Sequence, residues 1–184
     1  MNLLIKILLG CFTLSGPLLA QTYSISKNNE YFSIETPKGW KTRENFLGFP
    51  LLLRGPFDKK DGRSSLSVTM TGVADPGFDI SDLKASEEIY YKGRRTWLNK
   101  KEGTWKKSLP FEVLKSNDGN KIYTIGFEYI FGEVYFIERT YFYFCPKSMV
   151  FLKLLLTQKD ATNHMHLLNT IKNAKCVFRP SITK

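Results

Sequence analysis

The alternation of apolar and polar residues predicts strands in the first half of the chain. Residues 31–35 alternate, and a turn signal at residues 37–39 ends the run before Trp40. Residues 51–53 form a short apolar run, and residues 65–71 alternate again. The pattern therefore predicts three strands, the last with one face exposed to solvent.

The hydrophobic period changes to that of a helix between residues 81 and 101. Ser81, followed by Asp82, is the expected N-cap, because its hydroxyl can accept a free backbone N–H and the carboxylate suits the positive helix end. Steps of three and four residues mark the face expected to pack inward. This predicted stripe consists of Leu83, Ser86, Tyr90, Gly93 and Trp97.

Residues 105–157 predict a four-stranded antiparallel meander. Asp118-Gly119 is typical of a type I′ reversal, Gly132-Glu133 of a type II′ reversal, and residues 146–148 of a third turn. Pairing across the second turn fixes a register. The expected pairs are Phe131 with Val134, Tyr129 with Phe136, Phe127 with Glu138, Ile125 with Thr140 and Tyr123 with Phe142. On the opposite face, Glu128 and Arg139 are expected to pair diagonally.

A last helix is expected after the meander. Asp160 is its predicted N-cap. Met165, Leu168 and Ile171 form its inward stripe, with Leu167 and Ala174 alongside, and a basic tail follows at residues 178–184. The elements together predict an α+β domain, with about six or seven antiparallel strands packed between helices. Residues 21–184 are expected to form one domain, because the chain shows neither a linker nor an internal repeat.

The first twenty residues resemble a signal peptide. Lys6 lies in a short n-region, residues 7–19 are mostly apolar, and Ala20 before Gln21 is a suitable cleavage site. The mature protein is then expected to be periplasmic or secreted and to lack a transmembrane segment. In the alternative, Cys11 ends a lipobox and anchors the protein through a lipid, although Lys6 leaves little room for an h-region.

Cysteine usage agrees with an exported protein. The chain has three cysteines, and cleavage after Ala20 would remove Cys11. An even number in an oxidising compartment predicts a disulfide between Cys145 and Cys176. The alternative is two buried free thiols.

The chain is strongly basic, with a formal net charge of +10. An excess of this kind favours anionic partners, which outside the cytoplasm are lipid headgroups or acidic polysaccharides; the alternative is a basic protein that is merely soluble. Nucleic acid is not an expected partner, because an exported protein works in a different compartment. The densest basic cluster lies on the predicted helix and directly after it. The candidate anion-binding surface consists of Lys84, Lys92, Arg94, Arg95 and Lys101.

The sequence yields no catalytic, cofactor or metal motif. His164 and His166 point about 200° apart on a helix, so a shared metal is not expected. Asp58 and Asp61 are separated by two lysines, which argues against calcium. Glu128 and Glu138 are the two carboxylates within the central meander strands, on opposite faces in the predicted register. An enzyme would use one of them with sheet tyrosines, but a helix lysine near Glu138 is the simpler expectation.

Particular residues give the chain a resemblance to the PsbP-like superfamily, which includes the extrinsic PsbP subunit of the photosystem oxygen-evolving complex and many exported bacterial proteins. They are Tyr31, Phe32, Ile34, Pro37, Gly39 and Trp40, then Gly55 and Pro56, and the strand around Leu66 and Val68. The resemblance implies an antiparallel sheet between helices, an α/β/α sandwich, and a role in binding or scaffolding. No metal-site or partner-binding residues of the family match positions here.

The sequence therefore predicts a monomeric, exported binding or accessory protein of the cell envelope. Its expected partner is an anionic lipid or polysaccharide surface, or an envelope protein. A small envelope hydrolase or ligand-binding enzyme is the alternative function.

Overall fold

The computed structural model describes residues 21–71, 80–162 and 164–179. The predicted signal peptide, Cys11 and most of the predicted tail lie outside the described residues. The strands are β1 (Thr22–Lys27), β2 (Glu30–Glu35), β3 (Lys41–Phe46), β4 (Phe49–Arg54), β5 (Ser65–Met70), β6 (Thr104–Lys115), β7 (Lys121–Phe131), β8 (Val134–Phe144), β9 (Met149–Thr157) and β10 (Lys175–Phe178). The helices are α1 (Ile80–Ala85), α2 (Glu87–Asn99), α3 (Gln158–Ala161) and α4 (Met165–Asn173).

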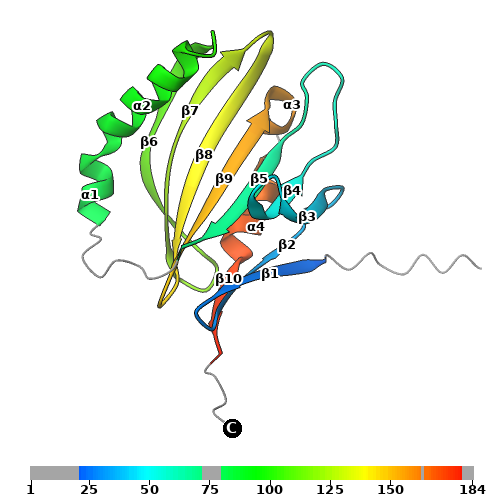
Figure 1. The fold of residues 1–184 in the computed structure, drawn as a ribbon, viewed down its shortest axis with the longest axis vertical. Helices are drawn as coiled ribbons and strands as arrows, with labels where there is room; N and C mark the ends of the chain where they lie inside the picture. The colour runs from blue at the N-terminus through cyan, green and yellow to red at the C-terminus, as the bar shows by residue number, and fades with distance from the viewer. Residues whose placement is uncertain (1–20, 72–79, 163, 180–184) are drawn as a thin grey trace, which may run out of the picture.

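The strands form two antiparallel sheets (Figure 1). The main sheet has seven strands in the order β3-β4-β5-β9-β8-β7-β6, and the second has three in the order β1-β2-β10. The α+β fold class predicted from the sequence is confirmed. One detail differs, because the first predicted strand, β2, belongs to the second sheet. One face of the main sheet is therefore covered partly by strands instead of by helices alone.

The larger core lies between the main sheet and the layer formed by the second sheet and α4. Phe32 and Ile34 of β2, together with Leu167 and Ile171 of α4, pack against the buried residues of β4, β5, β8 and β9. The opposite face of the main sheet packs against α2 in two smaller clusters, centred on Tyr91 and on Leu98. Apolar residues therefore alternate to both faces of the central strands, as a sheet buried on two sides requires.

The predicted meander is confirmed, and its register across the second turn agrees at every expected pair, from Phe131 with Val134 to Tyr123 with Phe142. The first reversal differs. The N–H of Gly119, whose φ is 88°, donates to the carbonyl of Ser116, so the loop has three residues with glycine last instead of a two-residue type I′ turn.

The diagonal pair expected on the other face of the meander does not form. Arg139 lies 3.4 Å from Glu112 of the edge strand β6, whereas Glu128 accepts a hydrogen bond from Tyr135. Arg139 therefore finds its partner on β6, outside the register of β7 with β8. Glu128 instead uses the other diagonal position of that register, where Tyr135 lies.

The helical region begins at Ile80, before the expected N-cap Ser81, and Ser86 divides it into α1 and α2. The predicted inward stripe is also wrong in part. Trp97 is 39% exposed, Gly93 is exposed, and the side chain of Leu83 lies outside the described part. The side chains of α2 that do turn inward are Glu87, Tyr90, Tyr91, Arg94 and Leu98. Two of these, Glu87 and Arg94, are charged. A pattern of hydrophobic residues does not reveal inward positions whose charges are satisfied by specific partners.

A bulge in β6 explains where α2 docks. The register of β6 with β7 shifts between Leu109 and Glu112, where Pro110 cannot donate a ladder hydrogen bond. Tyr91 of α2 donates from its hydroxyl to the carbonyl of Leu109 at 2.6 Å, and Glu87 accepts from the freed N–H of Phe111 at 3.3 Å. The helix thus satisfies the backbone groups that the bulge leaves without a strand partner.

The C-terminal elements also differ from the sequence prediction. Asp160 lies within the short α3, and α4 follows as a separate helix that begins at Met165. Leu167 and Ile171 are fully buried, whereas Met165 is 57% exposed. Ile171 and Leu168 of the predicted stripe therefore pack inward, and only Met165, the first residue of α4, does not.

Two glycines provide a matched test of the sheet packing. A Cβ at Gly126 of β7 would lie 2.3 Å from the carbonyl oxygen of Glu138, whereas one at Gly93 of α2 meets nothing within 4 Å. We expect Gly126→Ala to lower the free energy of unfolding by about 1 to 3 kcal/mol. Gly93→Ala should raise it by about 0.5 to 1 kcal/mol through helix propensity. Urea denaturation measures both, and a Gly126→Ala variant as stable as the parent would contradict this packing.

Candidate functional site

A charged cluster lies where α2 crosses the main sheet. Glu138 of β8 is 3% exposed, and its Oε1 lies 2.9 Å from Nζ of Lys153 on β9 and 3.7 Å from Nη2 of Arg94 on α2. This oxygen makes ion pairs but no hydrogen bond to any described residue. The two cations exceed the single carboxylate, so the cluster carries net positive charge.

Sequence reasoning anticipated a helix lysine beside Glu138. The helix instead supplies an arginine, and the lysine comes from the neighbouring strand. Lys153 pairs with Thr140 and Glu138 with Leu155, so the two charged residues are diagonal neighbours on one sheet face. The alternation along β9 places Lys153 on this face, but the pair can be recognised only once the register of β8 with β9 is known.

Two tyrosines feel the charge of Glu138, and this charge does not help them to lose a proton. Burial first, and then the negative charge of Glu138, raise the pKa of both Tyr90 and Tyr129. Their hydroxyls therefore stay protonated near neutral pH, which suits hydrogen-bond donors better than bases or nucleophiles. Glu128 projects to the opposite face, because it pairs with Ile137 while Glu138 pairs with Phe127.

The candidate anion-binding surface is divided by the fold. Lys84, Lys92, Arg95 and Lys101 are exposed, and Arg95 also lies 4.8 Å from the ring centroid of Trp105. Arg94 is the exception, since its side chain is 32% exposed and faces Glu138. It is a bridge between α2 and the sheet, which corrects the expectation that it projects to solvent.

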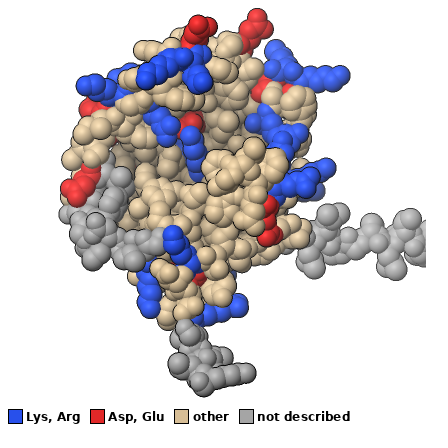
Figure 2. All heavy atoms as spheres, viewed as in Figure 1, with Lys and Arg blue, Asp and Glu red and all other residues tan. Residues whose placement is uncertain are grey.

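Further exposed lysines lie next to these four residues, at the end of α2 and on β6. We define the α2 basic surface as Lys84, Lys92, Arg95, Lys100, Lys101, Lys106 and Lys107, all of which are exposed. In Figure 2, lysine and arginine side chains gather over the upper end of the molecule, where α2 ends in Figure 1. The α2 basic surface is therefore exposed and charged.

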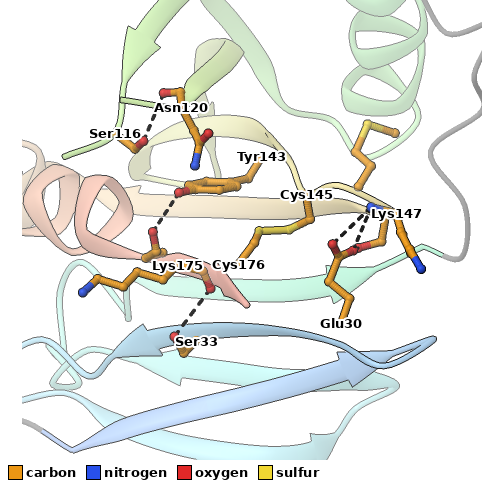
Figure 3. Close-up of a disulfide and its surroundings, with 12 residues drawn as sticks. Glu30, Ser33, Ser116, Asn120, Tyr143, Cys145, Lys147, Lys175 and Cys176 are labelled. Carbon is orange, nitrogen blue, oxygen red and sulfur yellow. Dashed lines mark hydrogen bonds between the residues drawn. A yellow bond between two sulfur atoms is a disulfide. The ribbon is translucent and has the colours of Figure 1, made fainter. Parts of the chain in front are cut away.

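A second polar corner surrounds the disulfide (Figure 3). Cys145, directly after β8, is bonded to Cys176 of β10, with their Cα atoms 5.6 Å apart. Glu30 is fully buried beside them and accepts hydrogen bonds from the N–H of Lys147 at 3.1 Å and the hydroxyl of Ser148. This carboxylate caps the turn between β8 and β9. Sequence reasoning missed Glu30, because no local pattern distinguishes it from a surface residue at the start of a strand.

A cavity of 720 Å³ opens between β1, the turn after β2 and the first half of β3. Tyr23, Pro37 and Trp40 are among its walls, and Lys38, Lys41 and Arg43 also line it. The lining residues of the cavity thus include all of the Pro37-to-Trp40 turn, which belongs to the motif that carries the family resemblance. Sequence reasoning did not predict a cavity at this motif.

Asp58 and His164, which sequence reasoning weighed as metal ligands, contact other groups of the protein. Asp58 lies 3.0 Å from Nζ of Lys159, and this contact, with the N–H groups of Asp61 and Lys60, lowers the pKa of Asp58 to about 2. Nδ1 of His164 lies 2.8 Å from the carbonyl of Ala161. Within residues 21–71, 80–162 and 164–179, no three metal-ligating side chains gather at one point. No helix in the same ranges has the length and apolar character needed to cross a bilayer.

The curved seven-stranded sheet, with α2 on one face and the second sheet with α4 on the other, defines a PsbP-like α+β fold. It is similar to the solution structure of cyanobacterial PsbP (CyanoP) from Synechocystis sp. PCC 6803, with a TM-score of 0.61 and 15% identity over 92% of this chain and 99% of that one.

It is also similar to the crystal structure of LpqN, a protein involved in cell envelope biogenesis of Mycobacterium tuberculosis. That match has a TM-score of 0.60 and 12% identity, and covers 86% of this chain and 92% of LpqN. No protein-family model and no curated protein matches the sequence. The likeness is therefore one of fold.

Proposed function

We propose that this chain is an exported accessory or binding protein of the cell envelope, which engages an anionic lipid or polysaccharide surface through the α2 basic surface. The observation that carries the proposal is the accumulation of exposed cations on α1, α2 and β6. Anionic surfaces attract such clusters by about 1 kcal/mol per basic residue close to them.

Two further observations support an envelope location. The disulfide between Cys145 and Cys176 is the kind of bond that persists in oxidising compartments. One of the structural neighbours, LpqN, is involved in cell envelope biogenesis. Both agree with removal of a signal peptide after Ala20, which we retain as part of the proposal. An envelope protein with an acidic face is the other partner that the same surface fits.

Charge reversal tests the α2 basic surface. We expect the triple variant Lys92→Glu, Arg95→Glu and Lys101→Glu to lose up to about 3 kcal/mol of affinity for phosphatidylglycerol vesicles, roughly a hundredfold, at low salt. Its melting temperature should fall only slightly, because exposed charges contribute little to stability. The contact that is lost, between Arg95 and the ring of Trp105, contributes about 0.5 to 1 kcal/mol at an exposed site. Co-sedimentation at about 0.01 M and about 0.15 M salt measures the binding, and the difference between variants should shrink at the higher salt.

A matched control separates a local surface from net charge. Lys27, Lys115 and Lys121 are also exposed, so reversing these three gives the same net charge away from α2. The control should bind vesicles much more strongly than the α2 variant. Equal binding by both variants would exclude α2 as the contact surface. Retention of an envelope protein without any vesicle binding would assign the surface to a protein partner instead.

A further inference from the structure

The cavity beside β1 and β3 owes its shape to the Pro37-to-Trp40 turn. The N–H of Trp40 donates to the carbonyl of Pro37 at 3.0 Å, and Gly39 has a φ of 80°, as the third residue of a type II turn requires. The turn carries the indole of Trp40 to a 9% exposed position. There it packs against Gly55, where an added Cβ would lie only 3.3 Å from the ring.

The cavity combines apolar walls with cations. The rings of Tyr23, Pro37 and Trp40 supply apolar surface, and the exposed side chains of Lys38, Lys41 and Arg43 supply three positive charges. None of its described lining residues is acidic. The charge of the cavity is thus not neutralised from within, and its volume of 720 Å³ falls in the range of small-ligand sites.

A polar pair adds hydrogen-bonding capacity to the same wall. The hydroxyls of Thr36 and Thr42 lie 2.6 Å apart, and both residues line the cavity. Only one of their two hydroxyl hydrogens is used in this contact, so the other is available as a donor. Arginine and lysine together with a hydroxyl donor are the groups that recognise a carboxylate or a phosphate monoester.

We propose that this cavity binds a single-chain amphiphile with an anionic headgroup. The headgroup lies among Lys38, Lys41 and Arg43, and the alkyl chain lies against Tyr23 and Trp40. The proposal goes beyond the proposed function, because none of these residues belongs to the α2 basic surface. Each site can therefore fail its test while the other passes.

Titration of the isotope-labelled protein, recovered after export, tests the proposal by two-dimensional amide NMR. The probes are dodecanoate, dodecyl phosphate, the uncharged dodecyl maltoside and inorganic phosphate. We expect shifts concentrated in residues 21–43, and binding of the anionic amphiphiles at least about tenfold tighter than that of the other two probes. Comparison of dodecanoate with dodecyl phosphate distinguishes a fatty acid from a phosphate headgroup.

Two sets of measurements locate the binding of the alkyl chain and of the headgroup. Shortening the probe from dodecanoate to decanoate should weaken binding about tenfold, because two methylenes leave an apolar wall. The double variant Lys41→Ser and Arg43→Ser should weaken dodecanoate binding by about fivefold to tenfold. Both residues are exposed, so this variant is expected to fold.

The triple α2 variant is the matched control and should bind dodecanoate as the parent does. Equal affinity for dodecyl maltoside, shifts centred outside residues 21–43, an unchanged double variant, or no binding of either anionic amphiphile would each overturn the proposal. Loss of vesicle binding in the α2 variant with dodecanoate binding intact would show that the two sites are independent.

Discussion

Replacing Cys145 and Cys176 by serine is expected to lower the free energy of unfolding by about 3 to 4 kcal/mol. The bond spans a sequence separation of 31, and release of a loop of this size restores chain entropy to the unfolded state by about that amount. The melting temperature should fall by about 6 to 16 °C for a chain of this length. Circular dichroism of the parent and the variant measures the shift.

The position of the bond makes the second sheet the first region to respond. β10 has only four residues and pairs with β2, so the disulfide fixes the short strand to the end of β8. Tyr143 helps at the same corner, since its hydroxyl donates to the carbonyl of Ala174 at 2.8 Å. Hydrogen exchange in β10 should accelerate more than exchange in β7.

Chemical reduction supplies the control for this prediction. Reductant should lower the melting temperature of the parent to that of the serine variant, and should leave the variant itself unchanged. A parent that melts at the same temperature with and without reductant, or that presents two alkylatable thiols when isolated from its own envelope, would contradict a stabilising disulfide.

The sequence predicted the central meander well because strong local signals agree there. Gly132 starts a tight reversal, and alternation on both sides of it fixes the pairing of β7 with β8. Two of the strands that were missed, β3 and β10, lack this agreement. β3 has the sequence KTRENF, with mostly exposed residues at the edge of the main sheet, and β10 is too short to show a period. β3 pairs with the next strand, β4, across a two-residue turn at Leu47 and Gly48, so it was missed because its polar sequence shows no clear alternation. β10 pairs with β2, a partner far away in the chain that local pattern does not contain.

The candidate sites were predictable only as far as one element shows them. The exposed basic residues of α2 lie on a single helix, so sequence spacing found them. The cluster at Glu138 joins α2, β8 and β9, and its two cations required the register of β8 with β9 and the docking angle of the helix. The cavity lined by Trp40 likewise depends on how β1 and β3 approach each other, which the turn motif alone does not specify.

Removing the cation nearest to Glu138 is expected to destabilise the protein more than removing Glu138 itself. Lys153→Met leaves a carboxylate that is 3% exposed with only Arg94, which is 3.7 Å away. A buried charge that loses its partner typically costs about 3 to 5 kcal/mol. The lower end applies here, because the side chain of Lys153 is 39% exposed and water already screens part of its interaction.

Glu138→Gln should cost less, about 1 to 2 kcal/mol, because Arg94 and Lys153 are each about one third exposed or more and can turn their charges to water. The double variant Lys153→Met and Glu138→Leu is the decisive member of the cycle. Replacing a buried ion pair by apolar groups of similar size is often neutral, so it should be more stable than Lys153→Met alone. Urea unfolding of these variants and of Glu138→Leu alone, which closes the cycle, measures the coupling. A Lys153→Met variant as stable as the parent, or additive losses in the double variant, would show that the pair contributes nothing to holding Glu138 in the sheet.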